Sequence, residues 1–130
     1  MSVVLLRHAS AGDRSKWKGD DRVRPLDKRG REQAEAISHA LLSLGVKRVV
    51  SSPYVRCVQT VEPLGLDIEL DERLAEGAAR DETLALLAGL DNAVACTHGD
   101  VIENVIGRSI KKGAAVVLED AVVVDELAAP

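Results

Sequence analysis

An arginine and a histidine follow a short apolar run near the start of the chain, and their side chains are the first that could do chemistry. Residues 3–6 have the continuous apolar pattern of a buried strand, and Arg7 and His8 stand where that strand should end. In an open α/β sheet, the carboxyl ends of the strands border the crevice that binds ligands. A guanidinium presents a planar fork to phosphate oxygens, and a neutral imidazole can attack phosphorus. The pair therefore indicates phosphate chemistry, with plain solvation of a strand end as the alternative.

Arg56, Glu76 and His98 each follow a different predicted strand, and none of these strands is the one that carries Arg7 and His8. Parallel strands of a doubly wound sheet end at the same edge, so we expect all five side chains to converge there. Such a set can move a phosphoryl group without a metal. The arginines hold the oxygens, a nucleophile attacks in line, and an acid protonates the leaving group. The sequence therefore predicts no metal and no cofactor.

Strands and helices alternate along most of the chain, which is typical of an α/β fold. Apolar patterns predict strands at residues 3–6, 47–50, 64–70 and 93–96, and a closing hairpin at 114–118 and 121–124. The clearest helix spans residues 31–44, and Gly45 ends it. Further helices are expected to begin at Ser52 before Pro53, at Asp81, and at Asp100 with Glu103 as its capping-box partner; the residues from Asp125 onward are expected to fray. We expect one domain over residues 1–130, a doubly wound, mostly parallel sheet with helices on both faces.

The composition limits the classes of function. A net charge of −4 over 130 residues argues against a general nucleic-acid binder. No apolar run has the length of a membrane span and no signal-peptide pattern precedes the first strand, so no membrane contact is expected. The two cysteines, Cys57 and Cys96, show neither a ligand-type spacing nor a disulfide framework, which favours buried thiols in a cytoplasmic protein. The chain has no phenylalanine, so its core must be aliphatic.

The stretch from residue 10 to residue 29 is polar and locally basic in an acidic chain. Its cations could steer an anionic substrate toward the first strand end, or the aspartates of the same loop could simply neutralise them. Trp17 in this loop could stack on a nucleobase or cover the core, and Tyr54 is expected at the rim of the pocket. The cations are Arg14, Lys16, Lys18, Arg22, Arg24, Lys28 and Arg29, and the aspartates are Asp13, Asp20, Asp21 and Asp27.

Four segments, taken together and in order, resemble the motifs of the histidine phosphatase superfamily, which has the phosphoglycerate mutase-like fold. They are Leu6-Arg7-His8-Ala9, residues 25–34, residues 51–60, and Thr97-His98-Gly99. The short length is similar to that of the SixA-type phosphohistidine phosphatases. Residues 16–21 also look like the phosphatase domain that follows a Nudix hydrolase domain in some bacterial proteins. Ala9 departs from the pattern, because the family usually has glycine there.

The resemblance implies a role for each matching residue. His8 would be the nucleophile that becomes phosphohistidine, and Glu76 would take the place of the proton donor. Arg7, Arg56 and His98 would bind the phosphoryl group and stabilise its charge in the transition state. Four further residues are expected to contact the substrate: Ser10, Trp17, Tyr54 and Gly99.

The expected function is that of a metal-independent phosphatase whose partner is a phosphohistidine protein or a phosphorylated small molecule. Protein phosphohistidine is the first expectation. Small phosphoesters or nucleotides are one alternative, and a non-catalytic module that binds phosphate or phosphohistidine is another. The position of Glu76 separates the two kinds of substrate, because an ester needs its departing oxygen protonated whereas a phosphohistidine has a far better leaving group. A phosphorelay carrier fits least, since such carriers are commonly helical bundles.

Overall fold

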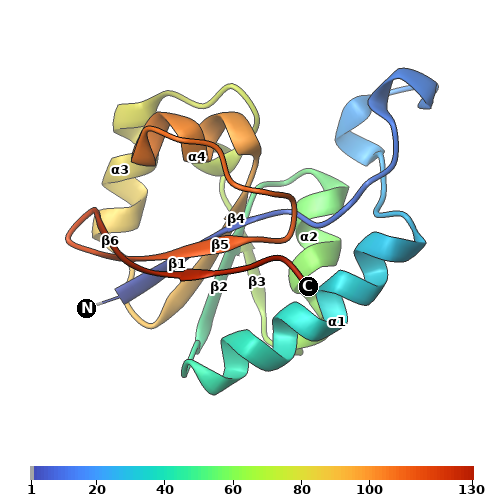
Figure 1. Ribbon diagram of the computed structural model, residues 1–130. Coiled ribbons are helices and arrows are strands. Elements are labelled where there is room, and N and C mark those ends of the chain that lie inside the picture. The colour runs from blue at the N-terminus through green and yellow to red at the C-terminus, as the bar shows by residue number, and fades with distance from the viewer. Residues whose placement is uncertain (1) are drawn as a thin grey trace.

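The described residues, 2–130, fold around a six-stranded sheet (Figure 1). Met1, which the predicted domain includes, lies outside the described residues of this computed structural model. The strands are β1 (Ser2–Arg7), β2 (Arg48–Ser51), β3 (Ile68–Leu70), β4 (Ala93–Thr97), β5 (Ala115–Glu119) and β6 (Val122–Leu127). They lie in the order β3-β2-β4-β1-β5-β6; the first four run parallel, and β5 and β6 form an antiparallel hairpin beside β1. The predicted, mostly parallel sheet is confirmed.

Two pairs of helices cover the two faces of the sheet (Figure 1). The first pair is α1 (Lys28–Ser43) and α2 (Val55–Val61), and the second is α3 (Arg80–Ala88) and α4 (Gly99–Ile106). Alternate residues of β1 belong to two separate cores: Val4 and Leu6 pack with the first pair, Val3 and Leu5 with the second. Both cores are aliphatic, and the two cysteines are buried free thiols, as predicted. The doubly wound fold with helices on both faces is therefore confirmed.

Some element boundaries differ from the predicted ones because local hydrogen bonds outweigh apolar periodicity. α1 begins at Lys28, three residues before the predicted start, because the Asp27 carboxylate accepts a hydrogen bond from Gly30 N–H at 2.7 Å. β3 is shorter than predicted, since residues 62–64 form a 3-10 turn that contains Pro63. The polar loop before α1 contains two further short turns, Arg14–Lys16 and Asp21–Val23, each begun by an aspartate cap.

The prediction that Ser52 caps the second helix is wrong. α2 begins at Val55, with Tyr54 in the cap position and no side-chain cap. The Ser52 hydroxyl is hydrogen-bonded instead to the ring of His98, 2.8 Å from Nε2. A long-range contact to a predicted site residue has therefore replaced the local cap that the Ser-Pro pair predicts.

The caps predicted for the last two helices are also wrong. α3 follows Ala79, so Asp81 lies inside its first turn. α4 has His98 in the cap position, and Asp100 and Glu103 form no capping box. The Asp100 carboxylate accepts a hydrogen bond from Gly77 N–H at 2.8 Å instead. In this way α4 holds the loop that contains Glu76.

The closing hairpin at the edge of the sheet is confirmed. Its two turn residues, Asp120 and Ala121, have φ values of 50° and 64°, as a two-residue hairpin turn requires. The predicted fraying from Asp125 onward is wrong, because β6 continues to Leu127 and the Pro130 carbonyl accepts a hydrogen bond from the side chain of Gln33 at 3.4 Å. Among residues 2–130, no helix is long and apolar enough to cross a bilayer.

Candidate active site

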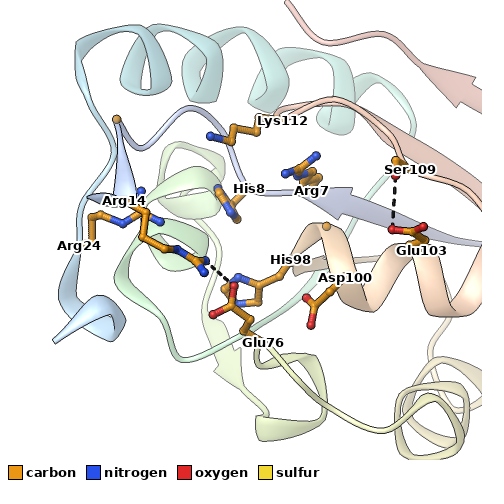
Figure 2. A pocket seen from close by; sticks show the side chains of 12 residues that line it. Arg7, His8, Arg14, Arg24, Glu76, His98, Asp100, Glu103, Ser109 and Lys112 are labelled. Carbon is orange, nitrogen blue, oxygen red and sulfur yellow. Dashed lines mark hydrogen bonds and ion pairs between the residues drawn. The ribbon is translucent and has the colours of Figure 1, made fainter. Parts of the chain in front are cut away.

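The carboxyl ends of β1 and β4 bring the two predicted histidines together. His8 N–H donates a hydrogen bond to the Thr97 carbonyl at 3.1 Å, which keeps the two strand ends side by side. The ring centroids of His8 and His98 lie 5.5 Å apart, with their planes at 66°. Beside the two rings is a cavity of about 390 Å³, a size typical of small-ligand sites (Figure 2). Arg7, Glu76 and Gly99 also line this cavity, so it contains four of the five predicted catalytic residues.

The ring of His8 is held in its neutral form. Nδ1 donates its proton to the Ala9 carbonyl at 2.8 Å, which leaves the lone pair of Nε2 free. The side chain is only 5% exposed. Burial lowers the pKa of His8 to about 3, and the nearby charges of His98, Arg56 and Arg7 act in the same direction. The imidazole is therefore neutral at neutral pH, with the lone pair of Nε2 available.

The low pKa of His8 makes the stability of the protein depend on pH. The folded state keeps His8 neutral down to a pH of about 3, whereas an unfolded chain protonates it near 6.5. Between these values the unfolded state binds one more proton, so the free energy of unfolding falls as the pH is lowered, by up to about 1.4 kcal/mol per pH unit for this group. Urea titrations at pH 6.5, 5.5 and 5.0 should show this slope in the wild type. In a His8→Asn variant the slope should be smaller by that amount, and equal slopes in the two proteins would contradict the assigned neutral state.

Arg7 lies against the amino end of α4. Its Nη1 donates to the Ile110 carbonyl at 2.7 Å, and its Nε is buried without a hydrogen-bond partner among residues 2–130. Gly99 makes this position possible, because a Cβ there would lie 2.8 Å from Arg7 Cζ. A buried donor without a partner indicates a missing acceptor, and an oxyanion in the cavity would supply one.

His98 is held from several sides and also has a donor to offer. Ser52 Oγ accepts the Tyr54 N–H at 3.2 Å, so its own proton is available for His98 Nε2. In that tautomer Nδ1 of His98 carries the ring proton, and Nδ1 is buried with no partner within residues 2–130. The ring of Tyr54 packs edge-on against His98, with centroids 4.6 Å apart. Tyr54 therefore contacts the ring of His98 but does not line the cavity.

Arg56 is placed differently from the other predicted phosphate ligands. It is fully buried, and it donates from Nη1 to the Asp21 carbonyl at 2.8 Å and from Nη2 to the Asp21 carboxylate at 2.9 Å. It lies 3.8 Å from the Glu76 carboxylate but does not line the cavity. Its Nε is buried without a partner among residues 2–130. The Arg56 fork thus binds the polar loop through Nη1 and Nη2, and Arg56 does not reach the cavity wall.

Asp21 is the functional-site residue that sequence reasoning assigned only to loop neutralisation. It pairs with three arginines, Arg56 at 2.9 Å, Arg24 at 2.8 Å and Arg14 at 3.6 Å. Burial alone would raise the pKa of Asp21, but the hydrogen bonds from Arg24 and Arg56 hold it below its usual value. Both interpretations of the basic loop are therefore partly right: aspartate neutralises some of its cations, and Arg14 and Arg24 line the cavity.

Glu76 reaches the cavity because its loop is anchored on both sides. The Thr97 hydroxyl donates to the Leu74 carbonyl at 2.6 Å, and Gly77 N–H donates to Asp100 at 2.8 Å. Arg14 donates to one carboxylate oxygen of Glu76 at 2.5 Å. Within residues 2–130, the other carboxylate oxygen accepts no hydrogen bond. Glu76 thus lies at the cavity wall with one oxygen available to a ligand (Figure 2).

Besides Tyr54, two more predicted substrate contacts lie away from the cavity wall. The Ser10 hydroxyl donates to Asp27 at 2.8 Å, so it serves the start of α1. Trp17 is 38% exposed, donates from Nε1 to the Asp20 carbonyl, and belongs to neither core, so it does not cover the core.

Ala9 can take the place of the glycine that is usual in the family, because its φ is not positive. Its N–H donates to the Thr60 hydroxyl at 3.0 Å.

Lys112 is a cavity residue that the sequence analysis did not single out. It lies in the loop between α4 and β5, outside the segments that resemble family motifs. The only signal for it was a pair of lysines just before a glycine and a small-residue strand. The assembled site then contains a neutral imidazole, unpaired donors on Arg7 and His98, further cations, and the carboxylates of Glu76, Asp100 and Glu103. This combination suits the binding and transfer of a tetrahedral, doubly charged phosphoryl group.

Comparison with known proteins agrees with this geometry. The sequence profile of the histidine phosphatase superfamily, branch 1, matches residues 3–85. The 8-oxo-(d)GTP phosphatase of Mycolicibacterium smegmatis is 41% identical over a match that covers 81% of this chain. The same match covers 36% of that protein, so the chain spans about a third of the length of this relative.

Solved structures share the fold. The protein histidine phosphatase SixA complexed with tungstate superposes with a TM-score of 0.80 at 21% identity, covering 98% of this chain and 97% of that one. A candidate phosphohistidine phosphatase SixA from Nakamurella multipartitia gives a TM-score of 0.74 at 26% identity, covering 90% and 83%. The profile match extends over well more than half of the sequence, and it includes the strand end that presents Arg7 and His8. The chain therefore belongs to branch 1 of the histidine phosphatase superfamily.

Proposed function

We propose that the protein is a phosphatase that hydrolyses small phosphoesters, nucleotides above all, through a phosphohistidine on His8. The observation that carries this proposal is that Glu76 lines the same cavity as His8. An alkoxide or ribose oxygen is a poor leaving group and needs a proton as it departs, which a carboxylic acid at the cavity wall can supply. The similarity to an 8-oxo-(d)GTP phosphatase supports nucleotides as the substrate class. Protein phosphohistidine, the first expectation from the sequence, becomes the second candidate.

The proposed reaction has two steps, formation of the phosphohistidine and its hydrolysis. In the first, His8 Nε2 attacks phosphorus, the bond to the ester oxygen breaks, and that oxygen takes the proton of Glu76. Nε2 has no proton to lose, because the ring proton lies on Nδ1 and is held by the Ala9 carbonyl. In the second, a water gives its proton to the Glu76 carboxylate and attacks phosphorus, the bond to Nε2 breaks, and inorganic phosphate leaves. Both steps move negative charge onto oxygens that Arg7 Nε and His98 Nδ1 are placed to bind.

Phosphohistidine remains a candidate because of the fold shared with SixA proteins. Its leaving group is an imidazole, which departs without help from a carboxylic acid. A phosphohistidine substrate would therefore give Glu76 no part in the first step.

A substrate panel tests the proposed function. The panel contains a nucleoside monophosphate, diphosphate and triphosphate, a sugar phosphate, p-nitrophenyl phosphate and a phosphohistidine peptide. We expect kcat/KM for the best nucleotide to exceed that for the phosphohistidine peptide by about tenfold or more. If the peptide is the better substrate, protein phosphohistidine is restored as the substrate class. Tight phosphate binding without turnover of any compound would identify a non-catalytic binding module instead.

A further inference from the structure

Besides Arg7, which faces the transferred phosphoryl group, three more cations line the cavity: Arg14, Arg24 and Lys112. Three carboxylates also line the cavity, and each has a partner: Glu76 pairs with Arg14, Asp100 accepts from Gly77 N–H, and Glu103 accepts from the Ser109 hydroxyl. Figure 2 shows Lys112 and Glu76 on opposite sides of the His8 ring, with Arg14 and Arg24 to one side. Arg14 pairs with Glu76 and Arg24 with Asp21, but Arg24 keeps a free Nη2, and Lys112 makes no ion pair within residues 2–130.

Arg24 is a cation built into the wall rather than a surface side chain. It is 5% exposed and still lines the cavity. Its Nε donates to Asp21 at 2.8 Å and its Nη1 to the Ala11 carbonyl at 2.6 Å, so two of its three nitrogens are fixed by the protein. Its Nη2 donates to no residue within 2–130. A guanidinium that is held in place with one free edge is preorganised for an oxyanion.

Lys112 reaches the mouth of the cavity from a different segment. The next residue, Gly113, donates its N–H to the carbonyls of both Arg7 and His8 at 3.1 Å, which fixes the lysine beside the nucleophile. Gly113 has φ +83°, which favours glycine at this turn. Lys112 makes no ion pair with any carboxylate of residues 2–130. Burial lowers the pKa of Lys112, and the positive charges of Arg7 and Arg24 lower it further. Like charges that converge beside a cavity favour an anion at that point.

We propose that Lys112 and Arg24 form a second phosphate subsite at the mouth of the cavity, so that the preferred substrates are phosphoanhydrides such as nucleoside diphosphates and triphosphates. This inference rests on the proposed function and narrows its substrate class. In-line attack sends the leaving group away from the imidazole, toward the mouth. The bond between His8 Nε2 and the terminal phosphorus forms, and the bond to the bridging oxygen breaks. The electron pair of that bond stays on the departing phosphate, which lies against Lys112 and Arg24 and needs less help from Glu76 than an alkoxide does.

Two non-hydrolysable probes separate the second subsite from the first. Methylphosphonate occupies one phosphate position, and methylenebisphosphonate occupies two adjacent ones. Titration calorimetry measures the Kd of each probe for the wild type, Lys112→Ala, Lys112→Arg and the matched control Lys111→Ala. Lys111 is exposed, does not line this cavity, and directly precedes Lys112.

We expect Lys112→Ala to weaken binding of the bisphosphonate by about tenfold, and of methylphosphonate by less than about twofold. Lys112→Arg should restore most of the lost affinity, and Lys111→Ala should change neither Kd. Equal weakening of both probes would place Lys112 on the transferred phosphoryl group and overturn the second subsite. Unchanged binding in Lys112→Ala would overturn it as well. These affinities do not depend on turnover, so a failure of the proposed phosphatase activity would appear separately, as an inactive protein in the substrate panel.

Discussion

Replacement of His8 by alanine is expected to lower kcat/KM for p-nitrophenyl phosphate on the order of a thousandfold or more. The loss follows from the geometry of the site, because His8 Nε2 is the buried, neutral and unprotonated nitrogen beside the cavity. Without it, water would have to attack the ester directly, and the remaining cations would only bind the substrate. The wild-type rate should persist in excess chelator, since the proposed steps use protein groups alone.

The chain offers a matched control for this experiment. His39 lies in α1 and is exposed, so His39→Ala removes an imidazole without touching the cavity. This variant should keep the wild-type rate. A His8→Ala protein that is as active as His39→Ala would remove His8 from the mechanism, and loss of wild-type activity with chelator would require a metal-dependent one.

The second large effect is expected at Glu76, and it should depend on the leaving group. Glu76→Gln keeps the shape of the side chain but cannot donate a proton to an alkoxide. We expect kcat/KM for a nucleoside monophosphate to fall about a hundredfold to ten-thousandfold, the usual contribution of general acid catalysis. For p-nitrophenyl phosphate, whose phenolate leaves readily, the decrease should be much smaller. Steady-state kinetics with both substrates measures the decrease in kcat/KM for each.

Glu72→Gln is the control for Glu76→Gln. Glu72 belongs to the same connecting segment, is exposed, and pairs with Arg22 rather than with a cavity residue. Its substitution should leave both substrates unaffected. If Glu76→Gln slows the two substrates equally, Glu76 acts by binding or by placing Arg14 and not as the proton donor. The preference for esters would then lose its main support.

The parts of the site that the sequence predicted are those fixed by strand ends. Arg7, His8 and His98 directly follow buried apolar runs, and the register of parallel strands brings such positions to one edge. Glu76 was predicted because it follows the strand expected at residues 64–70 and because the family resemblance implies a proton donor there. Its position depends on hydrogen bonds from Thr97 to the Leu74 carbonyl and from Gly77 to Asp100, which no local pattern encodes.

The parts that the sequence could not predict depend on contacts between distant segments. The pairing of Arg56 with Asp21 spans 35 residues and begins in a loop with no period. Ser52 has the local signature of a helix cap, yet its hydroxyl bonds to His98, 46 residues further along the chain. Lys112 becomes a cavity residue only because Gly113 N–H contacts the end of β1. In each case the local propensity was real, and a tertiary hydrogen bond decided the outcome.

The most direct test of the mechanism is to trap the covalent intermediate. The wild type is mixed with a fast-leaving aryl phosphate, quenched in alkali within one turnover to preserve phosphohistidine, digested, and analysed by tandem mass spectrometry. The account predicts one added phosphoryl group on the ring of His8, absent in His8→Asn and lost on treatment with acid. Turnover that proceeds at the full rate with no phosphoryl group on His8, or with the group on another residue, would contradict it.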